Sequence, residues 1–296
     1  MDSALAAVVA AYRTCEFATL SRDGTPMAWP TIPLLRPDGT LQVTTSVAFP
    51  QKALNVRRDG RVAMLFSDPT GSGLQDPPQV LVRGVATSPD EVLTSPEGLE
   101  PYWRELFRRQ PGNRGHLRPP MRWLMDWYYL RLVITVEPTE VTTLPALRPG
   151  PGSPVPADLL GAGYLARQPT AVLAAPGQDG APVLFRVHAV ADAGGFAVTV
   201  PDVLPVRDGA ASLLVHEHDE QIAGQRNAVV RGRLVTRTGG GRVVVPERVV
   251  DPMPMRTPAD MLTVIRHSRA ASHRYLDRRG LGRPRVRWDR FRALAG

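Results

Sequence analysis

The residues with the clearest potential for chemistry lie between Thr44 and Leu65, where hydroxyl side chains precede a short basic helix. Thr44, Thr45 and Ser46 end a predicted strand, and Lys52 stands near the start of the helix. Backbone N–H groups at a helix start and the helix dipole both favour an anion. Lys52 is the only lysine of the chain, and such a compact point charge suits a phosphate. The stretch therefore predicts a phosphate site, although short helices after a proline are also common without a ligand.

A second group that could do chemistry is the string His216-Glu217-His218-Asp219-Glu220. On a strand, alternate side chains point to the same face, so His216 and His218 could share a metal ion. No third ligand stands at a spacing typical of metal sites, and such a string beside a turn is more often solvated surface. We therefore predict no metal site in this chain.

Size and composition restrict the class of protein. The chain has 296 residues, of which 43% are hydrophobic and 22% charged, as in a globular protein of about two domains. The formal charge of +8 is spread over both halves without a run of five basic residues, so nucleic acid is not a predicted partner. No apolar run reaches the length of about 18 residues that crosses a bilayer. The single cysteine, Cys15, excludes an intrachain disulfide. We expect a cytoplasmic protein that binds no membrane.

Short strands joined by Asp-Gly turns dominate the first half, which is typical of an antiparallel barrel and not of a parallel sheet. The predicted strands cover residues 17–21, 26–34, 40–45, 61–66, 79–86 and 130–143. Helices are predicted at 3–13 and at 100–109, besides the short basic helix. The predicted fold class is therefore mainly β, with some helix.

The order of signals repeats after a stretch rich in proline and glycine. An Asp-Gly turn at 23–26 has a counterpart at 179–182, and Val-Arg-Gly at 82–84 has one at 230–232. We infer a duplication, with a first domain at 1–144, a linker at 145–156 and a second domain at 157–296. The closing strand of the second barrel is expected around Trp288, within reach of the interface.

The two halves differ at the segment that carries the predicted phosphate site. The first half has residues 47–61 between its strands, whereas the second has only residues 202–209, without a lysine or an asparagine. If the first copy binds a phosphate, the second cannot bind one in the same way. The sequence therefore predicts one competent site.

The first half resembles the pyridoxamine 5′-phosphate oxidase-like family of split-barrel proteins that bind flavins and deazaflavins. The resemblance rests on residues 17–21, the turn at 23–26, Thr44-Thr45-Ser46, the segment 51–62 and Val82-Arg83-Gly84, and it covers most of residues 14–90. The second half is similar only in outline. The resemblance implies two split β-barrels in tandem, packed as an intramolecular pseudo-dimer. A further homodimer is left open.

The resemblance also implies where a cofactor would lie, at the interface of the two barrels. The residues implied for the phosphate are Thr44, Thr45, Ser46 and Lys52, with Asn55 and Arg57 in support. Those implied for the cofactor ring are Trp29, Pro30 and Thr31. In one departure, Gln51 precedes Lys52 where such proteins carry Arg or Ser, which leaves one cation fewer at the phosphate.

These expectations point to an oxidoreductase that uses FMN or a deazaflavin on a small organic substrate. Because such a cofactor performs the redox chemistry, the protein need only orient it, and no acid–base pair or triad is required. The catalytic residues, if any, are not predicted. The alternatives are a haem-binding split barrel, a cofactor-binding protein without turnover, and a pseudo-enzyme in which both sites have decayed.

Overall fold

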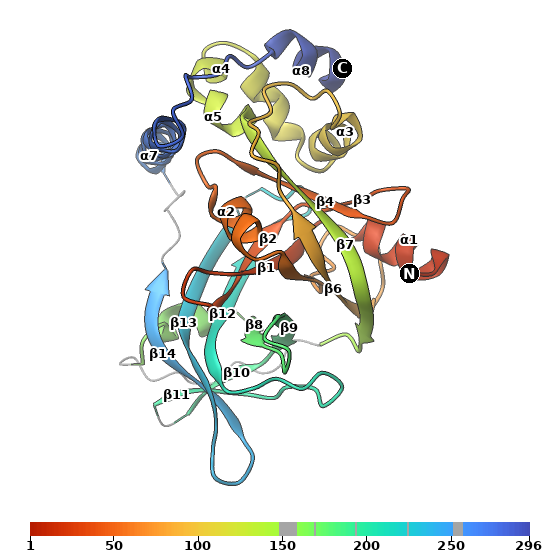
Figure 1. Ribbon diagram of the computed structural model, residues 1–296, viewed down its shortest axis with the longest axis vertical. Coiled ribbons are helices and arrows are strands. Elements are labelled where there is room, and N and C mark those ends of the chain that lie inside the picture. The colour runs from red at the N-terminus through yellow and green to blue at the C-terminus, as the bar shows by residue number, and fades with distance from the viewer. Residues whose placement is uncertain (148–158, 169, 193, 224, 251–256) are drawn as a thin grey trace.

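The computed structural model describes residues 1–147, 159–168, 170–192, 194–223, 225–250 and 257–296. Within these ranges the strands form two antiparallel sheets of seven strands each (Figure 1). The first sheet contains β1 (Cys15–Leu20), β2 (Pro26–Thr31), β3 (Leu34–Leu35), β4 (Leu41–Ser46), β5 (Arg61–Phe66), β6 (Gln79–Thr87) and β7 (Arg131–Leu144). The second contains β8 (Ala171–Pro176), β9 (Pro182–Val187), β10 (Ala189–Asp192), β11 (Gly195–Val198), β12 (Gly209–Glu217), β13 (Arg226–Thr236) and β14 (Arg242–Val250).

The two sheets have the same topology, which confirms the tandem split-barrel fold. The first has the order β2-β1-β5-β6-β7-β4-β3, and the second, read from its β9 edge, has β9-β8-β12-β13-β14-β11-β10. Each strand of the second sheet therefore takes the place of the strand seven numbers earlier. The register agrees too, since Pro26 pairs with Leu20 as Pro182 pairs with Pro176.

The Asp-Gly turns form because each aspartate caps its own turn. Asp23 accepts a hydrogen bond from the backbone N–H of Thr25 at 3.2 Å, and Asp179 accepts one from Ala181 at 3.0 Å. The glycine that follows each aspartate has a positive φ, 79° at Gly24 and 75° at Gly180. Other residues adopt this conformation only with strain, so glycine is needed there.

The barrels are joined by a reciprocal contact between their two recurring motifs. Arg231 of β13 forms an ion pair with Asp23 at 2.7 Å, and Arg83 of β6 forms the equivalent pair with Asp179. Each turn thus meets the Arg-Gly strand of the other barrel, as in a two-fold symmetric dimer. Around these pairs β2 packs on β8 and β12, while β9 packs on β1 and β5. The two barrels form an intramolecular pseudo-dimer.

The helices lie mostly around the first barrel. They are α1 (Ser3–Ala11), α2 (Gln51–Arg58), α3 (Glu100–Arg109), α4 (Met121–Leu124), α5 (Asp126–Tyr129), α6 (Ala162–Leu165), α7 (Pro258–Asp277) and α8 (Trp288–Ala295), with a 3-10 helix at Pro111–Leu117. Figure 1 shows α3, α4, α5 and α8 together at one end of the molecule. None of the helices in the described ranges is both long and apolar enough to cross a membrane.

The prediction of a closing strand around Trp288 is wrong. Trp288 begins helix α8. The last strand of the second sheet is instead β14, which lies between β13 and β11. The ring of Trp288 packs on Tyr129, and Phe291 packs edge-on against Trp103 and Tyr129. This aromatic contact holds the C-terminal helix on the first barrel. The alternation of arginine with apolar residues before Trp288 is typical of a strand. The aromatic partners of Trp288 are distant in sequence, so this local pattern could not indicate the packing that places it in a helix.

The predicted linker at 145–156 falls mainly on residues 148–158, outside the described residues. The domain boundaries therefore stay predictions. The C-terminal helices nevertheless contribute to the first barrel, since Tyr275 and Leu276 of α7 are part of its core. The second half of the chain thus supplies packing to both barrels.

The Arg-Gly strands yield a prediction about stability. Each carries a β-bulge at its glycine, where a Cβ atom would lie 2.3 Å from the carbonyl oxygen of Glu137 at Gly84, and 2.0 Å from that of Val245 at Gly232. Gly84→Ala and Gly232→Ala should each lower the free energy of unfolding by about 1–3 kcal/mol. Chemical denaturation measures this effect. Gly241→Ala is the control because its Cβ would meet no atom within 4 Å, and an equal loss there would contradict the explanation.

Candidate functional site

Lys52 is positioned by a tight connection between strand β4 and helix α2. The Thr45 hydroxyl donates to the carbonyl of Phe49 at 2.7 Å, and the Ser46 hydroxyl accepts from the N–H of Ala48 at 3.1 Å. The helix then begins after Pro50, and its buried Ala53 and Val56 anchor it in the core of the first barrel. Lys52 consequently lies at the edge of the buried face of α2 and is half-buried.

The ammonium group of Lys52 faces the predicted ring platform. Its Nζ lies 5.7 Å from the centroid of the Trp29 ring, at cation–π distance. No carboxylate or hydrogen-bond acceptor contacts this ammonium group among the described residues. The structure thus brings Lys52 and Trp29 together, although one lies on a helix and the other on β2.

A second cation, Arg131, lies beside Lys52 and was not among the predicted site residues. It is buried on β7, directly opposite Ser46 of β4. Its guanidinium lies 4.1 Å from the centroid of the Tyr128 ring and 5.2 Å from that of Trp103. Within the described ranges it forms no ion pair, and its Nε has no hydrogen-bond partner. Arg131 follows a turn and starts a long strand, and nothing local in the sequence distinguishes it from the other arginines.

Thr44 adds an unused hydrogen-bonding group on the same face of the sheet as Arg131. The Oγ1 of Thr44 is buried and makes no hydrogen bond of ordinary geometry in the described part of the chain, and the Tyr102 hydroxyl lies close enough to interact with it. Buried polar atoms are normally paired, so an orphaned hydroxyl next to an orphaned guanidinium nitrogen marks a place where a ligand would complete the bonding.

The electrostatics of the site favour an anion. The pKa of Lys52 is lowered from its ordinary 10.5 to about 8, mainly by burial and additionally by the positive charge of Arg131. Two cations that disfavour each other, with no carboxylate between them, create a positive field. A bound phosphate would relieve this repulsion, and it would also occupy the unused donors.

The remaining predicted residues are present at the site, but several have partners already. Ser46 donates to the carbonyl of Trp127 at 2.6 Å. Asn55 donates to the Thr19 hydroxyl at 2.9 Å, and Arg57 points away, to Asp90 at 2.9 Å and to the carbonyl of Ser88. Pro30 and Thr31 continue β2 beyond Trp29, opposite Glu16 and Cys15. Lys52, Arg131, Thr44 and Trp29, here called the Lys52 site, are thus the residues left with capacity for a ligand.

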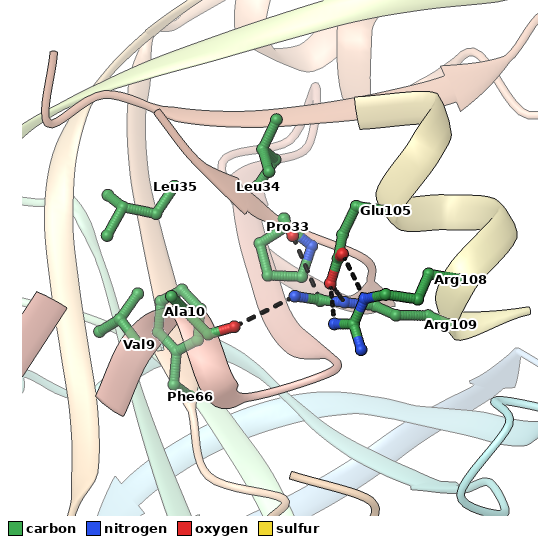
Figure 2. A pocket seen from close by; sticks show the side chains of 9 residues that line it. All are labelled: Val9, Ala10, Pro33, Leu34, Leu35, Phe66, Glu105, Arg108 and Arg109. Atoms are coloured by element: carbon green, nitrogen blue, oxygen red, sulfur yellow. Dashed lines mark hydrogen bonds and ion pairs between the residues drawn. The ribbon is translucent and has the colours of Figure 1, made fainter. Parts of the chain in front are cut away.

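Arg109, in a cavity of the first barrel, is a buried cation whose hydrogen-bond donors all have partners within the fold (Figure 2). This cavity of about 280 Å³ lies between α1, β3 and α3, and it contains the buried Arg109. Arg109 donates to the carbonyl oxygens of Arg13 at 2.8 Å and Ala10 at 3.2 Å, and it pairs with Glu105. Its charge and donors are used within the fold, so this cavity has a structural role and is not a second anion site.

A buried ionic network at the barrel interface was also not predicted. Glu16 is fully buried, and its Oε1 lies 2.7 Å from Arg186 and 2.7 Å from Nε2 of His216. Its Oε2 accepts from the Ser67 hydroxyl at 2.9 Å. Burial opposes ionisation of Glu16, but Arg186 and His216 outweigh this effect and hold its pKa below the usual range. The four residues, here called the Glu16 network, come from both barrels and from distant parts of the sequence.

Comparisons with known proteins give matches among solved structures only. No protein-family model matches the sequence, and no curated protein matches it. The protein Rv2991 from Mycobacterium tuberculosis is 26% identical, covers 49% of this chain and 85% of its own, and has a TM-score of 0.35. A Listeria innocua protein named for pyridoxamine 5′-phosphate oxidase is 19% identical over 48% of this chain and 96% of its own, with a TM-score of 0.32.

A protein named F420 reductase is 25% identical over 44% of this chain and 90% of its own, with a TM-score of 0.31. Each of these matches covers about half of the present chain. The fold itself is established by the strand order, which is the same in both halves. The chain is a tandem pair of split barrels.

Proposed function

We propose that the chain is an oxidoreductase that binds FMN or a phosphate-bearing deazaflavin at the Lys52 site and acts on a small organic substrate. The observation that supports this most is the pair of cations, Lys52 and Arg131, neither of which has an ion-pair partner among the described residues, together with the buried hydroxyl of Thr44. When bound, such a cofactor supplies the hydride or electron transfer. The protein's own contribution is binding, orientation and exclusion of water.

Each residue of the site has a role that follows from its surroundings. Lys52 and Arg131 would neutralise the phosphate, and Arg131 would supply the cation that is missing where Gln51 precedes Lys52. Thr44 would donate a hydrogen bond to a phosphate oxygen. Trp29, followed by Pro30 and Thr31, would offer its face to the planar ring system, at the edge where β2 packs on the second barrel.

The proposal includes one cofactor per chain. Residues 199–208 of the second barrel, which replace the segment that holds α2 in the first, are described throughout and contain no helix. They contain no lysine either. The pseudo-symmetry of the two barrels thus provides two equivalent places, of which only one carries the cations.

The colour of the purified protein is the first test. Bound FMN absorbs near about 450 nm, a deazaflavin near about 420 nm, and haem gives a Soret band, because each cofactor has its own electronic structure. Titration of the colourless protein with each compound gives the same answer if the cofactor is lost in purification. A Soret band, or no binding of FMN or a deazaflavin, would refute the proposal.

Lys52→Met should weaken the binding of FMN or the deazaflavin by about 1.5–3 kcal/mol, the contribution of a charged hydrogen bond. The same change should raise the Tm of the ligand-free protein by about 2–4 °C, or about 1 kcal/mol, because it removes a partly desolvated, unpaired charge beside Arg131. Fluorescence titration and thermal denaturation measure the two effects. Arg58→Met, which removes an exposed positive charge from the same helix, should leave the dissociation constant unchanged. A variant of Lys52 that binds the cofactor normally would exclude this residue from the site.

The binding should depend on pH with a known sign. Since the pKa of Lys52 is about 8 in the free protein, the ammonium is charged below that pH and becomes neutral above it. An anionic cofactor binds the charged form better, so its affinity should be constant from about pH 7 to 8 and fall as the pH rises further. Lys52→Arg keeps its charge throughout this range and should abolish the decrease. An unchanged decrease in Lys52→Arg would assign it to another group.

A further inference from the structure

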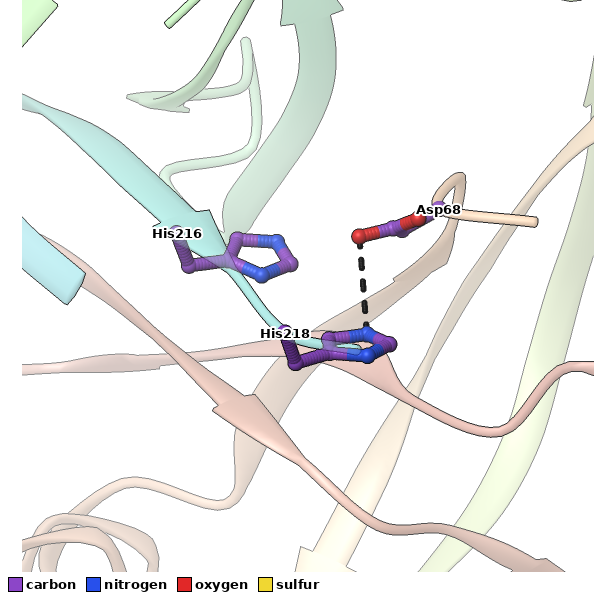
Figure 3. Close-up of side chains that lie close together, drawn as sticks. All are labelled: Asp68, His216 and His218. Carbon is purple, nitrogen blue, oxygen red and sulfur yellow. Dashed lines mark ion pairs between the residues drawn. The ribbon is translucent and has the colours of Figure 1, made fainter. Parts of the chain in front are cut away.

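The interface between the barrels contains a second group of side chains that the proposed function does not use. Asp68 follows strand β5 of the first barrel, whereas His216 and His218 lie at the end of β12 of the second. They line a cavity of about 380 Å³ that residues of both barrels enclose. Figure 3 shows the two imidazole rings one above the other, with the carboxylate of Asp68 beside them. Asp68 is the third ligand that the sequence around the histidines did not supply.

The spacing of the three side chains suits a metal ion. One ligand atom from each residue lies within 4.8 Å of the others, and Nε2 of His218 is 3.5 Å from Oδ2 of Asp68. Ligand atoms at zinc–nitrogen and zinc–oxygen bond lengths stand about 3.4 Å apart in a tetrahedral site. The Asp68–His218 pair already has this separation, and small side-chain movements would bring in His216.

The hydrogen bonds of each histidine indicate which of its ring nitrogens carries a lone pair. Nδ1 of His218 lies 2.8 Å from the carbonyl oxygen of Asp219, and because a carbonyl only accepts, that nitrogen carries the proton. In the neutral imidazole, Nε2 of His218 therefore carries a lone pair, which accepts a hydrogen bond from the Thr14 hydroxyl at 2.9 Å and which a metal ion would take over from that hydroxyl. In His216, Nε2 lies 2.7 Å from the Glu16 carboxylate and 3.3 Å from Arg186. A carboxylate only accepts, so in the neutral imidazole the proton is on Nε2 and Nδ1 carries the lone pair.

Nδ1 of His216 is the clearest sign of a missing ligand. The His216 side chain is completely buried, and its Nδ1 has no hydrogen-bond partner among the described residues. A histidine that donates one N–H to a carboxylate and offers the other nitrogen is the usual arrangement of a metal-binding imidazole. Glu16 would thus act as a positioning residue, while Arg186 neutralises its charge through the ion pair at 2.7 Å.

The pseudo-symmetry indicates that the interface does not need this network for its assembly. By strand register, the place that Glu16 occupies on β1 corresponds to Val172 on β8, and that of Arg186 on β9 corresponds to Pro30 on β2. The symmetry-related contact is therefore made without charges. Burying an ion pair at an interface adds little stability over apolar packing, so a different role for the charged copy is warranted.

We propose that Asp68, His216 and His218 form a binding site for a divalent transition-metal ion at the interface of the two barrels. Two imidazoles and one carboxylate suit Zn²⁺ or Fe²⁺ and are unsuited to Ca²⁺ or Mg²⁺, which prefer oxygen ligands. Three protein ligands leave at least one coordination position for water or another ligand. The site is built from both barrels, so the metal would also tie them together.

The test uses the full chain without an affinity tag, treated with a chelator and dialysed. Calorimetric titration with Zn²⁺ should give one ion per chain and a rise in Tm. Asp68→Asn and His218→Ala should each weaken binding by more than about 100-fold, since even changes outside the ligand shell cost about 10–100-fold. His267→Ala, at an exposed position of α7, should bind Zn²⁺ as the unchanged chain does.

Two results would overturn the proposal. One is the absence of Zn²⁺ binding tighter than about 10 μM. The other is stoichiometric binding that Asp68→Asn leaves unchanged. His218→Ala could fail to fold, and in that case two other measurements test the site. One is Zn²⁺ binding by the nearly isosteric Asp68→Asn. The other is the visible absorption of Co²⁺ bound to the unchanged chain, because the Co²⁺ bands report nitrogen and oxygen ligation. A Co²⁺ spectrum equal to that of the free ion would count against the site. All these measurements are independent of flavin binding.

Discussion

The reciprocal contact between the Asp-Gly turns and the Arg-Gly strands organises the whole molecule. Arg231 holds Asp23, and Arg83 holds Asp179, so one interaction occurs twice with the barrels exchanged. Surface ion pairs alone contribute little stability, but here they define the register of an extensive apolar interface. Leu173, Leu213 and Phe185 of the second barrel share one core with Ala28 and Leu65 of the first. The Glu16 network, which joins residues of both barrels, depends on the alignment that this contact defines.

Within this symmetric frame, the chemistry is asymmetric. The first barrel has helix α2 with Lys52, while the second has a short connection without a helix at the same place. Conversely, Arg186 and the two histidines belong to the second barrel. A homodimer would present each feature twice, whereas a fused chain is free to carry different residues at its two equivalent places. The tandem architecture thus explains how one chain can carry a cationic group in its first barrel and a histidine-rich group at the interface.

The state of the buried polar groups separates structural from ligand-binding positions. Arg109 is buried, donates hydrogen bonds to the carbonyl oxygens of Arg13 and Ala10, and pairs with Glu105. Its charge therefore stabilises the packing of α3 on α1. Arg131 is equally buried, yet it stacks on aromatic rings and forms no ion pair with any carboxylate in the described part of the chain. His216 combines both conditions, since one ring nitrogen is paired with Glu16 and the other is not. Unsatisfied groups of this kind are costly unless a ligand completes them.

The sequence by itself determined the fold class, the duplication and the place of Lys52. Asp-Gly turns, alternating strands and a lone lysine after a strand are local features, and local hydrogen bonding or backbone geometry produces them. Only the tertiary structure decided which side chains meet. Arg131 lies 79 positions beyond Lys52, and Asp68 lies 148 before His216, distances over which spacing carries no signal. Trp288 lies in a helix for the same reason. Its packing against Tyr129, which is distant in sequence, outweighs the strand-like pattern of the residues before it.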